Sequence, residues 1–111
     1  MKLVIAIVQD EDSTKLMSSL MHEGYSVTKL ATTGGFLRAG NTTLLTGVED
    51  EKLDRCLEII EHHGKSRKQL INSSIGSFDG AFLSAVTPSD IEVVIGGATV
   101  FVLDVDQFKK F

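Results

Sequence analysis

The first half of the chain alternates between a buried-strand pattern and an amphipathic-helix pattern. Residues 3–8 form a continuous apolar run rich in β-branched side chains, which is typical of a strand covered on both faces. Residues 10–13 (Asp-Glu-Asp-Ser) then supply the carboxylates and the hydroxyl that favour a helix N-terminus. Apolar residues at helical spacing follow as far as Gly24, namely Leu16, Met17, Leu20 and Met21. A central strand followed by a helix is therefore predicted.

The same order of patterns returns further along the chain. Residues 25–31 predict a second strand, and residues 42–48 predict a third after a glycine-rich stretch. Three acidic residues at 49–51 open a second helix that stops near Gly64. The apolar stripe of this helix is Leu53, Cys56, Leu57 and Ile60. The pattern thus predicts a second strand-helix unit.

The last part of the chain is less regular. Residues 65–90 show no convincing periodicity and predict a long irregular loop, whereas residues 91–103 predict the final strand. The pair Gly96-Gly97 inside that strand indicates a bulge or a close backbone approach. Residues 105–111 form a short tail for which one helical turn is expected.

Together these elements predict one α+β domain over residues 1–111. The order β-α-β-β-α-β is that of the ferredoxin-like fold, in which two helices cover one face of an antiparallel sheet. A glycine-rich loop at about 33–40 and the irregular loop at about 65–90 interrupt this core. Because the strands are apolar on both sides, the second sheet face needs another cover. Self-association is the simplest way to provide it.

Composition narrows the possible functions. The 111 residues, 42% of them apolar, suffice for one modest core. A net charge of −4 argues against binding of nucleic acid polymers or anionic lipid, and neither long apolar run matches a signal peptide or a membrane span. The single cysteine, Cys56, cannot form an internal disulfide, so a cytoplasmic location is expected.

The most unusual stretch is residues 32–43, with three glycines, four threonines and an asparagine around one aromatic and one basic residue. It partly matches a phosphate-binding P-loop, but Asn41 stands where the lysine is needed and the stretch joins two strands, which argues against nucleotide hydrolysis. A long hairpin connection is an equally simple interpretation. Phe36 and Leu37 favour a binding loop, since two exposed apolar side chains need a ligand or a neighbouring subunit to cover them.

Other chemistry-bearing residues form no recognisable set. His22, Cys56, His62 and His63 lack the spacing of a zinc site, and Cys56 lies on the apolar helix stripe. Solvated histidines and a core cysteine are therefore expected, with no metal and no cofactor. No Ser/His/Asp or Cys/His combination can be nominated, so we do not expect an enzyme.

Three segments carry a resemblance to a known family: residues 5–10, residues 28–43 and residues 96–103. They closely resemble the PII-like cyclic di-AMP receptors of Gram-positive bacteria, and the resemblance covers nearly the whole chain except residues 65–90. It implies a homotrimer that binds one cyclic di-AMP at each subunit interface, without catalytic activity, and signals to an unidentified downstream protein.

The resemblance also implies a set of ligand-binding residues. Thr28 and Asn41 would recognise an adenine by hydrogen bonds, Phe36 would stack on it, and Phe101 would belong to the neighbouring strand of the site. The full set is Thr28, Gly35, Phe36, Leu37, Arg38, Ala39, Asn41, Gly47, Gly97, Phe101 and Lys110. The family often has arginine where this chain has Ser26 and glutamine where it has Lys110. These two departures bear on the phosphate contacts.

Two other functions remain open at this stage: a PII-like sensor of ATP or another adenine nucleotide, and a metal-binding trimer of the copper-tolerance type. The missing P-loop lysine counts against the first. Hydroxyls and amides in the polar loop are poor ligands for soft metals, which counts against the second. In the favoured interpretation the ligand relays its signal by ordering the loops at about 33–40 and 65–90.

Overall fold

The computed structural model describes residues 1–30, 40–72 and 90–111, and it divides into two units. One unit comprises residues 1–65 and 96–111, and the other is Ser66–Ile95. The elements along the chain are β1 (Lys2–Gln9), α1 (Asp10–His22), β2 (Thr28–Leu30), β3 (Asn41–Val48), the 3₁₀ turn η1 (Asp50–Lys52), α2 (Leu53–Gly64), β4 (Arg67–Asn72), β5 (Asp90–Ile95) and β6 (Ala98–Asp104).

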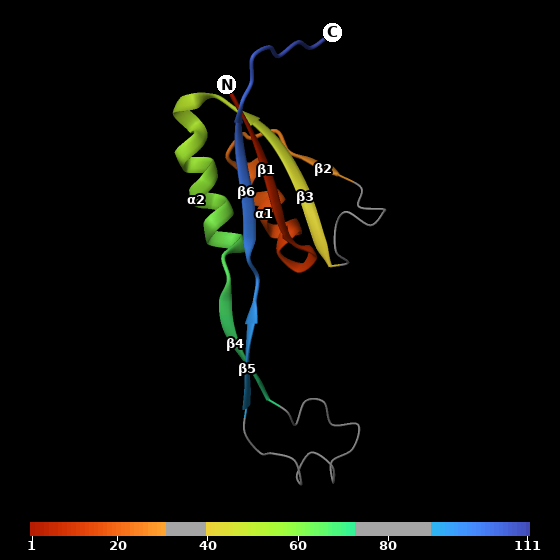
Figure 1. The fold of residues 1–111 in the computed structure, drawn as a ribbon, viewed down its shortest axis with the longest axis vertical. Coiled ribbons are helices and arrows are strands. Elements are labelled where there is room, and N and C mark those ends of the chain that lie inside the picture. Colours follow the sequence, from red (N-terminus) through yellow and green to blue (C-terminus); the bar gives the residue numbers. More distant parts are fainter. Residues whose placement is uncertain (31–39, 73–89) are drawn as a thin grey trace. The chain divides into compact units, whose positions relative to one another are not determined.

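A four-stranded sheet organises the first unit, with the strand order β2-β3-β1-β6 and antiparallel neighbours throughout (Figure 1). β1 lies in the middle, and its side chains alternate between buried and half-buried positions. Val4, Ala6 and Val8 point toward the helices and are almost fully buried. The structure confirms the predicted central position of this strand, but among the described residues only its face toward the helices is covered.

Both helices pack on that one face of the sheet. Leu16 and Leu20 of α1 are buried against it, and Cys56 and Ile60 of α2 complete the same hydrophobic core. The acidic first turn of α1, residues 10–12, favours a helix start through the helix dipole. The predicted arrangement of two helices on an antiparallel sheet is therefore confirmed.

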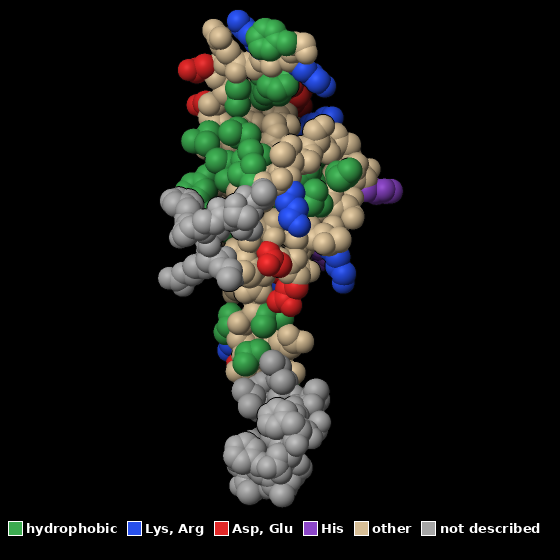
Figure 2. Space-filling view, turned by 90° about the vertical axis from the view of Figure 1, so that its right-hand side faces the viewer, with side chains coloured by type: hydrophobic (Ala, Val, Ile, Leu, Met, Phe, Trp, Pro, Cys, Tyr) green, Lys and Arg blue, Asp and Glu red, His purple; other side chains and the backbone are tan. Residues whose placement is uncertain are grey.

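The opposite face of the sheet, called the outer face below, has no described element packed over it. Leu3, Ile5 and Ile7 of β1 are half-buried there, while Phe101 and Leu103 of β6 are 52% and 47% exposed. Figure 2 shows hydrophobic side chains gathered along one side of this unit. Within residues 1–30, 40–72 and 90–111 this face is apolar and has no covering element, as the sequence predicted.

The second strand is shorter than predicted. Residues 25–31 were expected to pair, but β2 covers only Thr28–Leu30 within the described residues. The amide of Tyr25 donates to the carbonyl of Leu20 at 3.0 Å, and its hydroxyl donates to the carbonyl of Lys52 at 2.9 Å. Tyr25 is thereby tied to the end of α1 and to the turn before α2 instead of joining the sheet.

The prediction for residues 65–103 was wrong in two respects. The expected irregular loop begins with a strand, β4, which pairs antiparallel with β5 as a separate two-stranded sheet. The expected single final strand is divided into β5 and β6 at Gly96 and Gly97, whose φ angles of 78° and 112° strongly favour glycine. Residues 105–111 contain no helical turn.

A solvated ribbon explains why β4 lacks a hydrophobic signal. Leu70 of β4 and Val94 of β5 are 63% and 67% exposed, so neither strand has to alternate apolar and polar residues to fill a core. The ammonium of Lys68 lies 3.2 Å from a carboxylate oxygen of Glu92 across the two strands.

Candidate functional site

Six of the sequence-predicted site residues lie in the described part of the chain: Thr28, Asn41, Gly47, Gly97, Phe101 and Lys110. The other five lie outside it: Gly35, Phe36, Leu37, Arg38 and Ala39. The loop predicted at about 33–40 thus falls almost entirely outside the described residues. The strands that flank this loop, β2 and β3, carry Thr28 and Asn41.

Strand register places Thr28 and Phe101 on the same row of the outer face. Thr28 pairs with Leu45, Leu45 pairs with Ile5, and Ile5 pairs with Phe101. Thr28 therefore lies on one edge strand and Phe101 on the other. With neighbouring strands about 4.8 Å apart, the two backbones are separated by about 14 Å. Within one chain these two residues therefore do not contact each other.

Asn41 and Gly97 lie at one end of the same sheet. Asn41 pairs with Gln9, and the side-chain oxygen of Gln9 accepts a hydrogen bond from the amide of Gly96 at 2.9 Å. The amide of Gly97 donates to the carbonyl of Gly64 at 2.6 Å. These bonds fix the backbone between β5 and β6 beside the end of β1.

Gly64 permits this close approach because a Cβ atom there would lie only 3.1 Å from Cβ of Ala98 and 3.2 Å from Cγ1 of Val8. Val8 is fully buried in the central strand and cannot easily move. The end of α2 is therefore seated directly on β1 and β6, next to the turn that contains Gly97.

Three threonines of β3 differ in what their hydroxyls bind. The hydroxyl of Thr42 bonds a carboxylate oxygen of Asp10, and the hydroxyl of Thr46 donates to the carbonyl of Ser26 at 2.6 Å. Both side chains face the helices, because Thr42 pairs with Val8 and Thr46 with Val4. Thr43 faces the outer side, is only 5% exposed, and among the described residues its Oγ1 has no hydrogen-bond partner.

Sequence reasoning did not single out Thr43. It placed residues 32–43 together as one polar loop, although the third strand was predicted from residue 42. Alternation along that strand could have separated Thr43, on the face of Asn41, from Thr42, on the face of the core.

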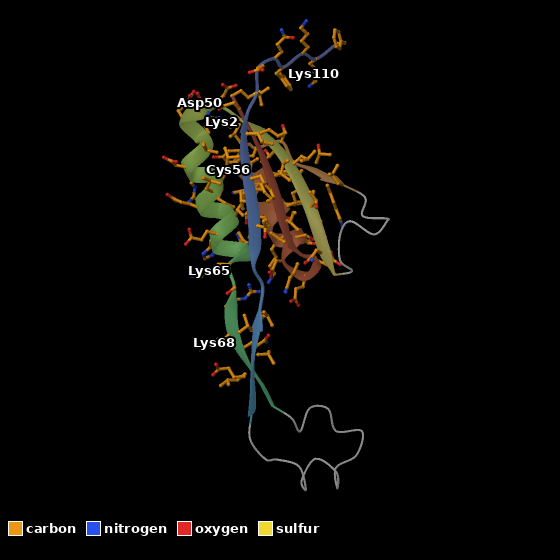
Figure 3. All side chains as sticks on the ribbon, viewed as in Figure 1. Lys2, Asp50, Cys56, Lys65, Lys68 and Lys110 are labelled. Atoms are coloured by element: carbon orange, nitrogen blue, oxygen red, sulfur yellow. The ribbon has the colours of Figure 1, made fainter. Side chains whose placement is uncertain are left out.

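Gly47 and Lys110 lie near the opposite end of the sheet from Gly97. Gly47 pairs with Leu3 and is exposed. Figure 3 shows Lys110 in the terminal segment, beyond the end of the sheet where Lys2 and Asp50 lie. The structure therefore does not bring Lys110 together with Gly97 in one chain.

A groove between α1 and α2 is a separate cavity of about 620 Å³ that contains none of the sequence-predicted site residues. The guanidinium of Arg55 in this groove lies 2.6 Å from a carboxylate oxygen of Glu23 and 3.1 Å from a carboxylate oxygen of Glu58. The positive charge of Arg55 is therefore already compensated. His63 shares a 2.8 Å hydrogen bond with Ser19. Burial, followed by the charges of His62 and Lys15, lowers the pKa of His63.

The described residues offer no metal centre, because no three His, Cys, Asp or Glu side chains among them gather into a ligand set. His22 and His62 are exposed, and Cys56 is buried in the core with a pKa raised by burial to about 11. A core cysteine was predicted from the helix stripe, and the structure confirms it. No helix in the described part is long and apolar enough to cross a membrane.

Comparison with known proteins gives two findings. A family model described as cyclic-di-AMP receptor matches residues 1–111. The chain is also similar to a crystal structure of a functionally unknown protein from Pediococcus pentosaceus ATCC 25745, with 44% sequence identity and a TM-score of 0.76. That similarity covers 99% of this chain and 96% of the other.

Proposed function

Because the chain belongs to the cyclic-di-AMP receptor family, we propose that it is a signal-transduction protein that binds cyclic di-AMP at the interfaces of a homotrimer and catalyses no reaction. The observation that carries this proposal is the division of the candidate residues. Thr28 and Asn41 lie on one side of the outer face, whereas Phe101 lies on the opposite edge strand.

In the proposed trimer, each subunit contributes one ferredoxin-like unit. The strand order β2-β3-β1-β6 with two helices on one face supports this topology. The outer face supports self-association, since Ile5, Phe101 and Leu103 form an apolar surface that a second copy would cover. A closed cyclic trimer buries this surface in every subunit.

The interface then completes the binding site. Thr28 and Phe101 of one chain lie on opposite edge strands about 14 Å apart, whereas edge strands of adjacent subunits can approach each other. Thr28 and Asn41 of one subunit recognise an adenine in this proposal, and Phe101 of the next subunit contacts the same nucleotide. Phe36 stacks on the base, and Gly35, Leu37 and Gly47 line the pocket.

The signal follows from preferential binding to one conformation. The segments between β2 and β3 and between β4 and β5 are both proposed to become ordered around the ligand. A ligand that binds the ordered state more tightly increases its population and changes the surface presented to a downstream protein. A cytoplasmic location, where a nucleotide second messenger is available, fits this role.

Calorimetric titration of one preparation with cyclic di-AMP, cyclic di-GMP, ATP and zinc tests the proposal against its alternatives. We expect binding of cyclic di-AMP that is at least tenfold tighter than that of the other three ligands. Preference for ATP would establish the adenine-nucleotide sensor instead, and preference for zinc would establish the metal-binding trimer.

A further inference from the structure

The hydroxyl of Thr43 is a buried polar group without a partner among the described residues. Only 5% of the residue is exposed. A buried hydroxyl that loses its bond to water and gains no other destabilises the folded state, so such groups are uncommon in folded proteins. A threonine at this position therefore calls for a physical reason.

Strand preference alone does not explain it. Valine has nearly the same shape, is also β-branched, and would occupy this strand position without burying a hydroxyl. The two other threonines of β3 do use their hydroxyls, Thr42 toward Asp10 and Thr46 toward Ser26. Thr43 is the member of this group whose hydroxyl bonds to nothing in the described part of the chain.

The position of Thr43 connects it to the candidate site. It lies two residues after Asn41 on the same face of β3, about 7 Å away along the strand. Thr28 is its diagonal neighbour on β2, about 7–8 Å away, because Thr28 pairs with Leu45 and Leu30 pairs with Thr43. Thr43 thus lies between the two residues expected to recognise the adenine.

We propose that Thr43 is a further specificity-determining residue, whose hydroxyl hydrogen-bonds the adenine of bound cyclic di-AMP. This inference rests on the proposed function. A hydroxyl both donates and accepts, so it can serve either the exocyclic amine or a ring nitrogen of adenine. Binding then supplies a bond that the hydroxyl does not make within the described part of the chain, and this gain appears as affinity.

Replacement of the hydroxyl by a methyl group tests the inference. We expect Thr43→Val to weaken cyclic di-AMP binding about tenfold, as loss of one good hydrogen bond should. Its ligand-free melting temperature should stay the same or rise, since the buried hydroxyl that is removed has no hydrogen-bond partner in the described ranges. Thr43→Ser keeps the hydroxyl and should bind with nearly wild-type affinity.

Thr42→Val is the matched control on the neighbouring position. It removes a hydroxyl that is paired with Asp10 on the core side, so it should lower the melting temperature and leave affinity nearly unchanged. Light scattering of all three variants, without ligand, should give the same mass as wild type. A changed mass for Thr43→Val would assign the hydroxyl to the subunit interface and overturn the inference.

Cyclic di-GMP distinguishes the base from the sugar and phosphate that both dinucleotides share. Thr43→Val should lose more affinity for cyclic di-AMP than for cyclic di-GMP. Equal losses would move the contact to the shared backbone, and an unchanged affinity for cyclic di-AMP would overturn the role of Thr43 altogether. If wild type itself does not bind cyclic di-AMP, the proposed function fails, which is a result separate from the outcome for Thr43.

Discussion

A charge placed on the outer face should prevent assembly of the proposed trimer, and Leu103→Asp is the substitution we would make. Leu103 is 47% exposed in the single chain and pairs with Leu3 of the central strand β1. Since fully burying a leucine contributes about 1.5–3 kcal/mol, covering the exposed part contributes about 0.7–1.4 kcal/mol per subunit.

The introduced carboxylate adds a larger effect. Moving an unpaired charge out of water into an apolar interface costs several kcal/mol even after relaxation. Three subunits each bear this cost, so the trimer should dissociate at micromolar concentration. The fold of each chain should persist, because the outer face is not part of the core formed with the helices.

Val102→Asp is the matched control. Val102 is the adjacent residue of β6, is 41% exposed, and pairs with Val4 on the helix side of the sheet. Size-exclusion chromatography with light scattering, without ligand, should give a monomer for Leu103→Asp and a trimer for Val102→Asp and wild type. Circular dichroism checks that both variants are folded. A trimer for Leu103→Asp would refute assembly through the outer face.

Three further predictions concern the core, the helix groove and the loop. Cys56 should react with a thiol reagent only on unfolding, because burial raises its pKa to about 11; rapid labelling of the folded protein would contradict this. The pKa of His63 is lowered in the folded state, so its contribution to stability is present above its unfolded pKa and is lost on acidification. The melting temperature of wild type should therefore fall more between about pH 7.5 and pH 5.5 than that of His63→Gln; parallel curves would refute it. Phe36→Ala should weaken cyclic di-AMP binding by about 1–3 kcal/mol without changing the assembly mass, as loss of a base-stacking surface should; unchanged affinity would make Phe36 a packing residue.

Hydrophobic periodicity predicted the elements that form the core. Val4, Ala6 and Val8 had to be apolar because they pack against the helix stripe that contains Cys56, and this requirement is visible in the sequence. β4 is not visible in this way, because its side chains are solvated and its pairing with β5 depends on backbone hydrogen bonds. The glycine pair 96–97 indicated an irregularity in the strand, but periodicity alone could not distinguish a bulge from the end of a strand.

The candidate site was predicted mainly from resemblance, and its residues remain predictions. Local patterns identified the glycine-rich stretch, but they carried no information about strand register. Only the register shows that Thr28 and Phe101 lie on opposite edges of one face. Likewise, only the hydrogen bonds distinguish Thr43 from Thr42 and Thr46, which are the same residue type on the same strand.

Mixing of two defective subunits tests most directly whether the ligand is bound between chains. Asn41→Ala and Phe101→Leu each damage every site of their own trimer, and we expect at least tenfold weaker binding of cyclic di-AMP by either one alone. Leucine keeps apolar bulk on the outer face, so assembly should be retained. Each variant's mass is measured first by light scattering.

Co-expression of the two variants should restore some intact sites. Each site takes Asn41 from one subunit and Phe101 from the next. It is intact when the first subunit is a Phe101→Leu chain, which keeps Asn41, and the next is an Asn41→Ala chain, which keeps Phe101. Random assembly of equal amounts yields such sites at about a quarter of all interfaces in a cyclic trimer. Calorimetry should therefore detect wild-type affinity at about a quarter of the wild-type capacity. If the mixture shows only the weak binding of the separate variants, the site does not combine these residues across subunits, and the interface account is wrong.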